Sequence, residues 1–254
     1  MRRSLACATA AVLTVGAFAV PARATTTPST SPKVAYGYAW PDGKGHLRIV
    51  PKSATLVKQQ GFLGYRLKTL AGAKEVRLDY TRAAVGRVTV ACDLKETEGQ
   101  VALDAKGLGR TRCKPGDLAA ALGQGATPMR VEYQDGRAVR VNEILISNWP
   151  NPRTASGTIE RVDDRTVLFA TGGRTYKLGY SYMLYFYRTT ARCKDGWLAG
   201  RPVNADRNGL GKRACGPDDL ARALRSVEHP VLAKLRFSPE TGGVDEVWEV
   251  YGDA

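Results

Sequence analysis

The most constraining feature of this sequence is a segment that occurs twice. When the chain is shifted by 102 residues, GLGRTRCKPGDLAAAL at 107–122 aligns with GLGKRACGPDDLARAL at 209–224, and ten of the sixteen positions are identical. The same shift places Asp104 on Asp206 and Pro128 on Pro230. Self-similarity of this kind indicates a duplicated unit, and about 100 residues per copy are enough for a separate hydrophobic core. The sequence therefore predicts two related domains.

The first residues have the layout of a secretory signal peptide. Two arginines precede an apolar stretch from Leu5 to Val20, and Ala22-Arg23-Ala24 fits an A-x-A cleavage site. The stretch is short for a membrane span, which needs about 20 apolar residues. We therefore expect residues 1–24 to be removed and a Thr/Ser/Pro-rich leader over 25–32 to follow. The mature chain is expected to be secreted, extracellular and without a membrane span.

The cysteines belong to the two copies. Apart from Cys7, the chain has Cys92 and Cys113 in the first copy and Cys193 and Cys215 in the second. An even number of cysteines in an exported chain is typical of disulfides, and the close C-x-x-C pairs that zinc prefers do not occur. Because a unit that once folded alone would close its own bond, we expect Cys92–Cys113 and Cys193–Cys215. Pairing between the copies is the alternative.

Alternating apolar residues predict strands around the duplicated segment. Lys74–Tyr80 and Gly86–Cys92 both alternate, the second through Val88, Val90 and Cys92. Turn signals interrupt alternating stretches and so predict hairpins; they occur at residues 41–45, 135–136, 163–164 and 239–243.

The duplicated segment itself predicts a short helix in each copy. Pro115 and Pro217 suit a first helical turn, and Asp117 and Asp219 complement the N-terminal dipole. Each copy is thus expected to be mostly β (α+β), a small twisted sheet or partial barrel with one helix and one disulfide; an OB-like barrel is among the alternatives. The expected domains are 33–146 and 158–254, joined by a proline-containing linker at 147–157.

The positive charge is concentrated in the first copy. After loss of three arginines with residues 1–24, the formal charge falls from +14 to +11. Residues 25–153 then carry 20 basic and 11 acidic groups, whereas residues 154–254 carry 15 and 13. Such an excess favours an anionic partner, and we expect a cell-wall polymer or an extracellular protein rather than nucleic acid. Scattered basic residues that serve only solubility are the alternative.

Residue types that carry catalysis are few. The two histidines, His46 and His229, do not recur between the copies, and a G-x-S-x-G elbow is absent from the sequence. Asn204–Gly209 has oxygen side chains at alternate positions like a calcium loop, but Cys215 stands where the bidentate acid is required. We therefore expect no enzyme activity, no cofactor and no metal site.

An aromatic stretch, LGYSYMLYFYR at 178–188, is the first candidate for binding. On a strand, Tyr180, Tyr182 and Phe186 would share one face, and Tyr185 and Tyr187 the other. Outward tyrosines beside Arg188 can stack on sugars, bases or a protein partner, so Tyr182, Tyr185, Tyr187 and Arg188 are candidate binding residues. The alternative is that the tyrosines simply cover a small barrel.

The segment Arg87–Asp93 (RVTVACD) resembles part of the Streptomyces subtilisin inhibitor family, and the resemblance extends over residues 87–140. Members are small secreted inhibitors in which a disulfide loop, a helix and a closing strand pair follow such a strand. The family's Gly-Thr-His-Pro stretch and second disulfide have no match here, so no reactive-site residue is carried over. The resemblance implies an alternative function, inhibition of an extracellular serine protease through the loop Asp93–Arg112, with Arg110 and Arg112 as candidate contacts.

The expected function is therefore that of a secreted, non-catalytic binding protein that acts outside the cell on cell-envelope polymers or on an extracellular protein. The protease inhibitor is the alternative.

Overall fold

The structure, a computed structural model, describes residues 31–97 and 99–252. The predicted signal peptide, Cys7 and most of the predicted leader lie outside the described residues. Two sheets are formed, and each contains one copy of the duplicated segment. We call residues 33–146 repeat 1 and the residues from Arg153 onward repeat 2.

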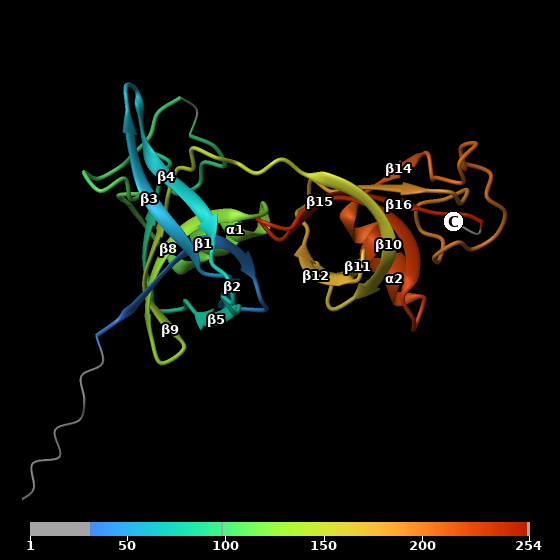
Figure 1. The fold of residues 1–254 in the computed structure, drawn as a ribbon, viewed down its shortest axis with the longest axis horizontal. Helices are drawn as coiled ribbons and strands as arrows, with labels where there is room; N and C mark the ends of the chain where they lie inside the picture. Colours follow the sequence, from blue (N-terminus) through green and yellow to red (C-terminus); the bar gives the residue numbers. More distant parts are fainter. Residues whose placement is uncertain (1–30, 98, 253–254) are drawn as a thin grey trace, which may run out of the picture. The chain divides into compact units, whose positions relative to one another are not determined.

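Repeat 1 contains a sheet, an inserted hairpin and one helix (Figure 1). Its elements are β1 (Lys33–Pro41), β2 (His46–Ile49), β3 (Lys52–Gln59), β4 (Phe62–Thr69), β5 (Val76–Asp79), β6 (Ala84–Arg87), β7 (Thr111–Cys113), α1 (Pro115–Gly123), β8 (Thr127–Gln134) and β9 (Arg137–Glu143).

Repeat 2 has the same order of elements without the inserted hairpin. It contains β10 (Arg153–Arg161), β11 (Thr166–Thr171), β12 (Arg174–Gly179), β13 (Tyr185–Arg188), β14 (Arg213–Cys215), α2 (Pro217–Arg225), β15 (Val231–Ser238) and β16 (Gly243–Glu249). A two-residue turn, Gly172-Gly173, joins β11 to β12, whereas β3 and β4 stand between the corresponding β2 and β5.

Strand pairing closes a ring of five strands in each repeat. In repeat 1, β1 pairs with β2, β2 with β5, β5 with β9, β9 with β8, and β8 with β1. In repeat 2 the same ring runs through β10, β11, β12, β16 and β15. The link between the third and last strands is one residue pair in each repeat, so closure is partial. The predicted mostly-β fold of two similar partial barrels is confirmed, and five partly closed strands match the OB-like alternative.

The helix of each repeat packs into the barrel interior, and β10 curves around α2 (Figure 1). Leu118 and Leu122 of α1 are buried among Leu47, Leu78 and Val131. Leu220 and Leu224 of α2 are buried in the corresponding core of repeat 2. The spacing of these leucines, i and i+4, places both on one helix face. The predicted helices are confirmed, and neither is long and apolar enough to cross a membrane within the described residues.

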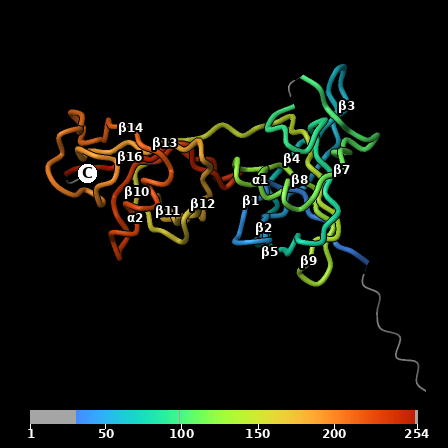
Figure 2. Tube along the Cα trace, turned by 180° about the vertical axis from the view of Figure 1, so that it is seen from behind, coloured from blue at the N-terminus to red at the C-terminus, as the bar shows by residue number. Residues whose placement is uncertain are grey.

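Both disulfides form as the duplication predicts. Cys92 bonds to Cys113 and Cys193 to Cys215, and the Cα atoms are 5.6 Å apart in each pair. Each bond closes a long loop that leads into a short strand, β7 or β14, and then directly into the helix. The loop of repeat 2 lies beside β14 and β16 in both views (Figures 1 and 2).

Two strand predictions need correction. β6 ends at Arg87, and Val90 is exposed on the bend that follows, so the alternation through Val88, Val90 and Cys92 does not belong to a strand. Bonds from the Arg87 side chain turn the chain there, as described below. β10 begins at Arg153, within the predicted linker 147–157, because its first residues pair with β15.

Candidate functional site

A buried ion pair holds the beginning of each disulfide loop. In repeat 1, Arg87 Nε donates to Glu143 Oε1 at 2.8 Å, and both side chains are almost completely buried. The guanidinium also donates to the carbonyl oxygens of Cys92 and Leu94, at 2.6 and 2.9 Å. The other carboxylate oxygen of Glu143 accepts the backbone N–H of Val88. One ion pair thus ties the loop to β9.

Repeat 2 repeats this arrangement with Arg188 and Glu249. Arg188 Nη2 donates to Glu249 Oε1 at 2.6 Å, and both side chains are fully buried. The guanidinium also donates to the carbonyl oxygens of Cys193, Asp195 and Gly196. A fully buried arginine cannot contact a surface ligand, so the prediction of Arg188 as a binding residue is wrong. The sequence signal for its real role is the recurrence of an arginine five residues before the first cysteine of each copy.

Exposed cations alternate along the edge of repeat 1. Arg110, Arg112 and Lys114 are all exposed, and the residues between them, Thr111 and Cys113, are half-buried. β7 is the last strand of its sheet, so one of its two edges has no neighbouring strand. Because side chains alternate along extended chain, the three cations point in a common direction. None of the three forms an ion pair with any residue that the structure describes. We call them the cationic row.

The inserted hairpin β3–β4 adds further positive charge. Residues 51–73 contain four basic residues and no acidic one. Lys58, Arg66 and Lys68 are exposed. The fourth, Lys52, is buried beside Thr69, and burial lowers its pKa. The hairpin therefore presents three cations to solvent.

The hairpin contacts the loop that leads into the cationic row. Tyr65 Oη donates to the carbonyl oxygen of Lys106 at 2.6 Å. Gly107 has a positive φ of 74°, and a Cβ there would lie 3.2 Å from Leu56. Glycine is favoured at such a position because it lacks the Cβ that opposes this conformation. The hairpin thus contacts the loop that precedes the cationic row, and we call the exposed cations of these two elements together the basic surface of repeat 1.

Repeat 2 lacks most of this charge. It has no counterpart of the hairpin, and Lys212, Ala214 and Gly216 stand where repeat 1 has Arg110, Arg112 and Lys114. The charge difference between the two halves of the sequence therefore has a structural source. It lies in one inserted element and one edge strand.

An aromatic row lies on the outer side of the repeat 2 sheet. Tyr185 and Tyr187 of β13 stack with their ring centroids 6.2 Å apart, and Tyr187 stacks on Trp248 of β16 at 5.3 Å. Tyr185 is exposed, while the other two are half-buried. The predicted outward pair is therefore present, and Trp248 was missed because it is distant in sequence. Lys234 pairs with Trp248 across β15 and β16, which places a cation beside the row.

Tyr182 does not join the aromatic row. It is exposed on the turn between β12 and β13, whereas Tyr180 and Phe186 are buried in the core. The predicted common face of Tyr180, Tyr182 and Phe186 is therefore wrong. β13 begins only at Tyr185, so the two-residue period does not extend to Tyr182.

Carboxylates shape both disulfide loops. Asp206 Oδ1 accepts the backbone N–H groups of Asn208 and Leu210, each at 2.8 Å, and these bonds hold the Asp206 pKa below its usual value. Asp104 accepts the N–H groups of Lys106 and Leu108 in the same way. An aspartate that closes a turn through its own backbone explains the calcium-like spacing at 204–209.

Comparisons with family models, curated proteins and solved structures found no match to this chain. The resemblance to the subtilisin inhibitor family and the protease-inhibitor alternative stay predictions. The function is therefore inferred from the geometry of the two repeats.

Proposed function

We propose that this chain is a secreted, non-catalytic protein that binds anionic cell-envelope polymers through the basic surface of repeat 1. The main observation is that one copy of the duplicated barrel has the full cationic row and the basic hairpin, whereas the other lacks the hairpin and has a cation at only one of the three row positions. Solubility alone would not require the added cations to lie on the hairpin and beside the loop that the hairpin contacts.

The chemistry of the surface suits a flexible polyanion. The cations of the row are two residues apart, with Arg112 on the edge strand β7 and Arg110 and Lys114 directly beside its ends, so neighbours are about 7 Å apart. Several exposed ionic contacts along one chain add up, although each is weak and is screened by salt. The aromatic row of repeat 2 offers a second kind of contact, because aromatic rings pack on the apolar faces of sugars.

The non-catalytic part of the proposal rests on the positions of the titratable groups. His46 lies at the start of β2, where its Nδ1 is 3.0 Å from the carbonyl oxygen of Lys44. His229 is exposed in the turn before β15, in the other repeat. Asp164 bonds to Arg161 and Arg225, which lower its pKa and favour the charged form. These groups serve turns and surface ion pairs.

The test is co-sedimentation of the mature protein with purified cell walls, before and after extraction of their anionic polymers. Binding is expected to need the polymers and to weaken with added salt. Replacement of Arg110, Arg112 and Lys114 by alanine should weaken it about tenfold, since three exposed ionic contacts contribute about 0.5 kcal/mol each.

A matched control removes three exposed cations from repeat 2: Arg174→Ala, Arg201→Ala and Arg207→Ala. The net charge changes equally, so this variant should bind within about twofold of the unmodified protein. Equal weakening by both variants would mean that only net charge matters. Equal binding to extracted walls would reject an anionic polymer as the ligand.

A further inference from the structure

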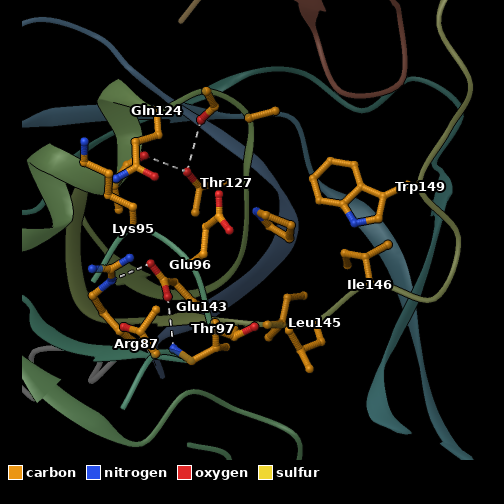
Figure 3. Close-up of a pocket in the computed structure, with 17 residues that line it drawn as sticks. Arg87, Lys95, Glu96, Thr97, Gln124, Thr127, Glu143, Leu145, Ile146 and Trp149 are labelled. Carbon is orange, nitrogen blue, oxygen red and sulfur yellow. Dashed lines mark hydrogen bonds and ion pairs between the residues drawn. The ribbon is translucent and has the colours of Figure 1, made fainter. Parts of the chain in front are cut away.

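A pocket in repeat 1 has no assigned occupant. It has a volume of about 260 Å³ and lies between the start of the disulfide loop, the end of α1 and the residues after β9. Figure 3 shows Gln124 and Thr127 on one side, Ile146 and Trp149 on another, and Glu96 between them. Its volume is below the range of about 300–1,000 Å³ that is typical for drug-sized ligands. The pocket suits a small group.

The floor of the pocket is fixed and its rim is polar. Ile144, Ala121 and the Arg87–Glu143 pair are buried beneath it. Lys95 and Glu96 are exposed at the opening. The charges in the floor are paired with each other, and apolar side chains line the rest of it, so the pocket favours a planar, largely apolar group that enters from solvent.

Repeat 2 shows what fills the equivalent space. Each buried arginine donates to the carbonyl oxygen of the residue seven positions later. The two repeats can therefore be aligned with Arg87 on Arg188 and Leu94 on Asp195. In the same register, Glu96 corresponds to Trp197. Trp197 is 7% exposed and stacks on Phe186 with centroids 5.7 Å apart. The loop of repeat 2 therefore inserts its own indole ring.

Two neighbouring positions follow the same pattern. Thr97 corresponds to Leu198 and Gly125 to Val227, and both Leu198 and Val227 pack against the core of repeat 2. Ser226, which corresponds to Gln124, accepts the backbone N–H of Trp197 at 3.0 Å. Repeat 1 thus lacks three apolar side chains around one point while it keeps the ion pair and helix that frame it.

We infer that the repeat 1 pocket is a binding site for an indole-sized planar aromatic group supplied from outside the chain. The group would occupy the space that Trp197 occupies in repeat 2. An aromatic group of this chemistry can come from either of two sources, a free aromatic small molecule or a tryptophan side chain of a partner polypeptide. Aromatic anchors in such pockets are typical of the energetic centres of protein interfaces. The inference does not depend on polymer binding.

The test uses indole and N-acetyl-L-tryptophanamide as probes, followed by ¹⁵N NMR of the mature protein. Both should shift the amide signals of Gln124, Thr127 and Ile144 saturably, with a dissociation constant of about 1 mM, as expected for so small a ligand. Binding of both probes would indicate a tryptophan side chain as the source. Binding of indole alone would indicate a free small molecule.

Two variants separate the pocket from non-specific binding. Glu96→Trp places an indole where repeat 2 has Trp197 and should weaken probe binding by about tenfold or more. Glu96→Gln removes the same charge but leaves the space open, and should bind within about twofold of the unmodified protein. Unchanged binding to Glu96→Trp, or no saturable shift at these three amides in the unmodified protein, would overturn the inference. Because Glu96 is exposed, neither variant is expected to prevent folding.

Discussion

Two buried arginine–glutamate pairs hold the turns that begin the disulfide loops. A buried charge without its partner is strongly unfavourable, because the protein interior does not replace the lost hydration. Arg188 is fully buried, and its guanidinium orients three loop carbonyls as well as Glu249. The pair therefore couples the loop conformation to the last strand of the barrel.

Replacing Glu249 by alanine should lower the free energy of unfolding of repeat 2 by about 3–5 kcal/mol, because Arg188 would stay buried without a counter-ion. Guanidinium unfolding followed by tryptophan fluorescence measures this change. Glu246→Ala on the same strand is the control, since its partner Arg236 is largely exposed, and it should cost less than about 1 kcal/mol. Similar losses for both variants would contradict a special contribution from the buried pair.

At the scale of elements, the disulfides could be predicted from the sequence, whereas the inserted hairpin could not. The disulfides follow from the duplication, because each copy must close its own loop. The hairpin has a two-residue turn at Gln60-Gly61, which lacks the Asn-Gly or Asp-Gly pair that favours such turns. Its strands are also only partly buried, so their two-residue pattern is weak.

Removing one disulfide should destabilise its own repeat. Cys92→Ala with Cys113→Ala should lower the stability of repeat 1 by about 3 kcal/mol, because the unfolded chain regains the entropy of a loop of this size. Hydrogen exchange of the amides in β8 and β9 should become faster, while that in β15 and β16 should not change. Faster exchange in both pairs of strands would show that the repeats do not unfold separately.

At the scale of the whole molecule, the predicted signal peptide affects both the cysteine count and the charge of the chain. The signal-peptide prediction removes Cys7 and leaves four cysteines, all of which are paired in the structure. It also lowers the formal charge from +14 to +11 and leaves the basic surface of repeat 1 intact.

Protein recovered from the culture medium of an expressing bacterium should begin at Thr25. N-terminal sequencing checks the cleavage site, and a thiol assay of the denatured protein should find no free thiol, because the four cysteines that the structure describes are paired and Cys7 lies in the segment predicted to be removed. One free thiol per chain, or an N-terminus before Cys7, would contradict the predicted cleavage.

The sequence alone determined the duplication, the disulfide pairs, the two helices and most hairpins. These features depend on local chemistry, such as turn residues, alternating apolar side chains and a repeated cysteine register, and each can be recognised without knowing where the chain returns. Arg110 and Arg112 also became candidates from the sequence, as basic residues of a disulfide-closed loop, but only the structure places Arg112 on the edge strand β7.

Tertiary structure decided the features that join distant segments. Arg188 lies beside tyrosines in sequence, yet its side chain is buried because Glu249, 61 residues later, offers a counter-ion inside the barrel. Trp248 joins Tyr187 only because β16 pairs with β13. The repeat 1 pocket likewise brings together Glu96 and Gly125, which are far apart in sequence and stand where repeat 2 has Trp197 and Val227. Packing between distant residues decides burial, and burial decides which side chains stay available for binding.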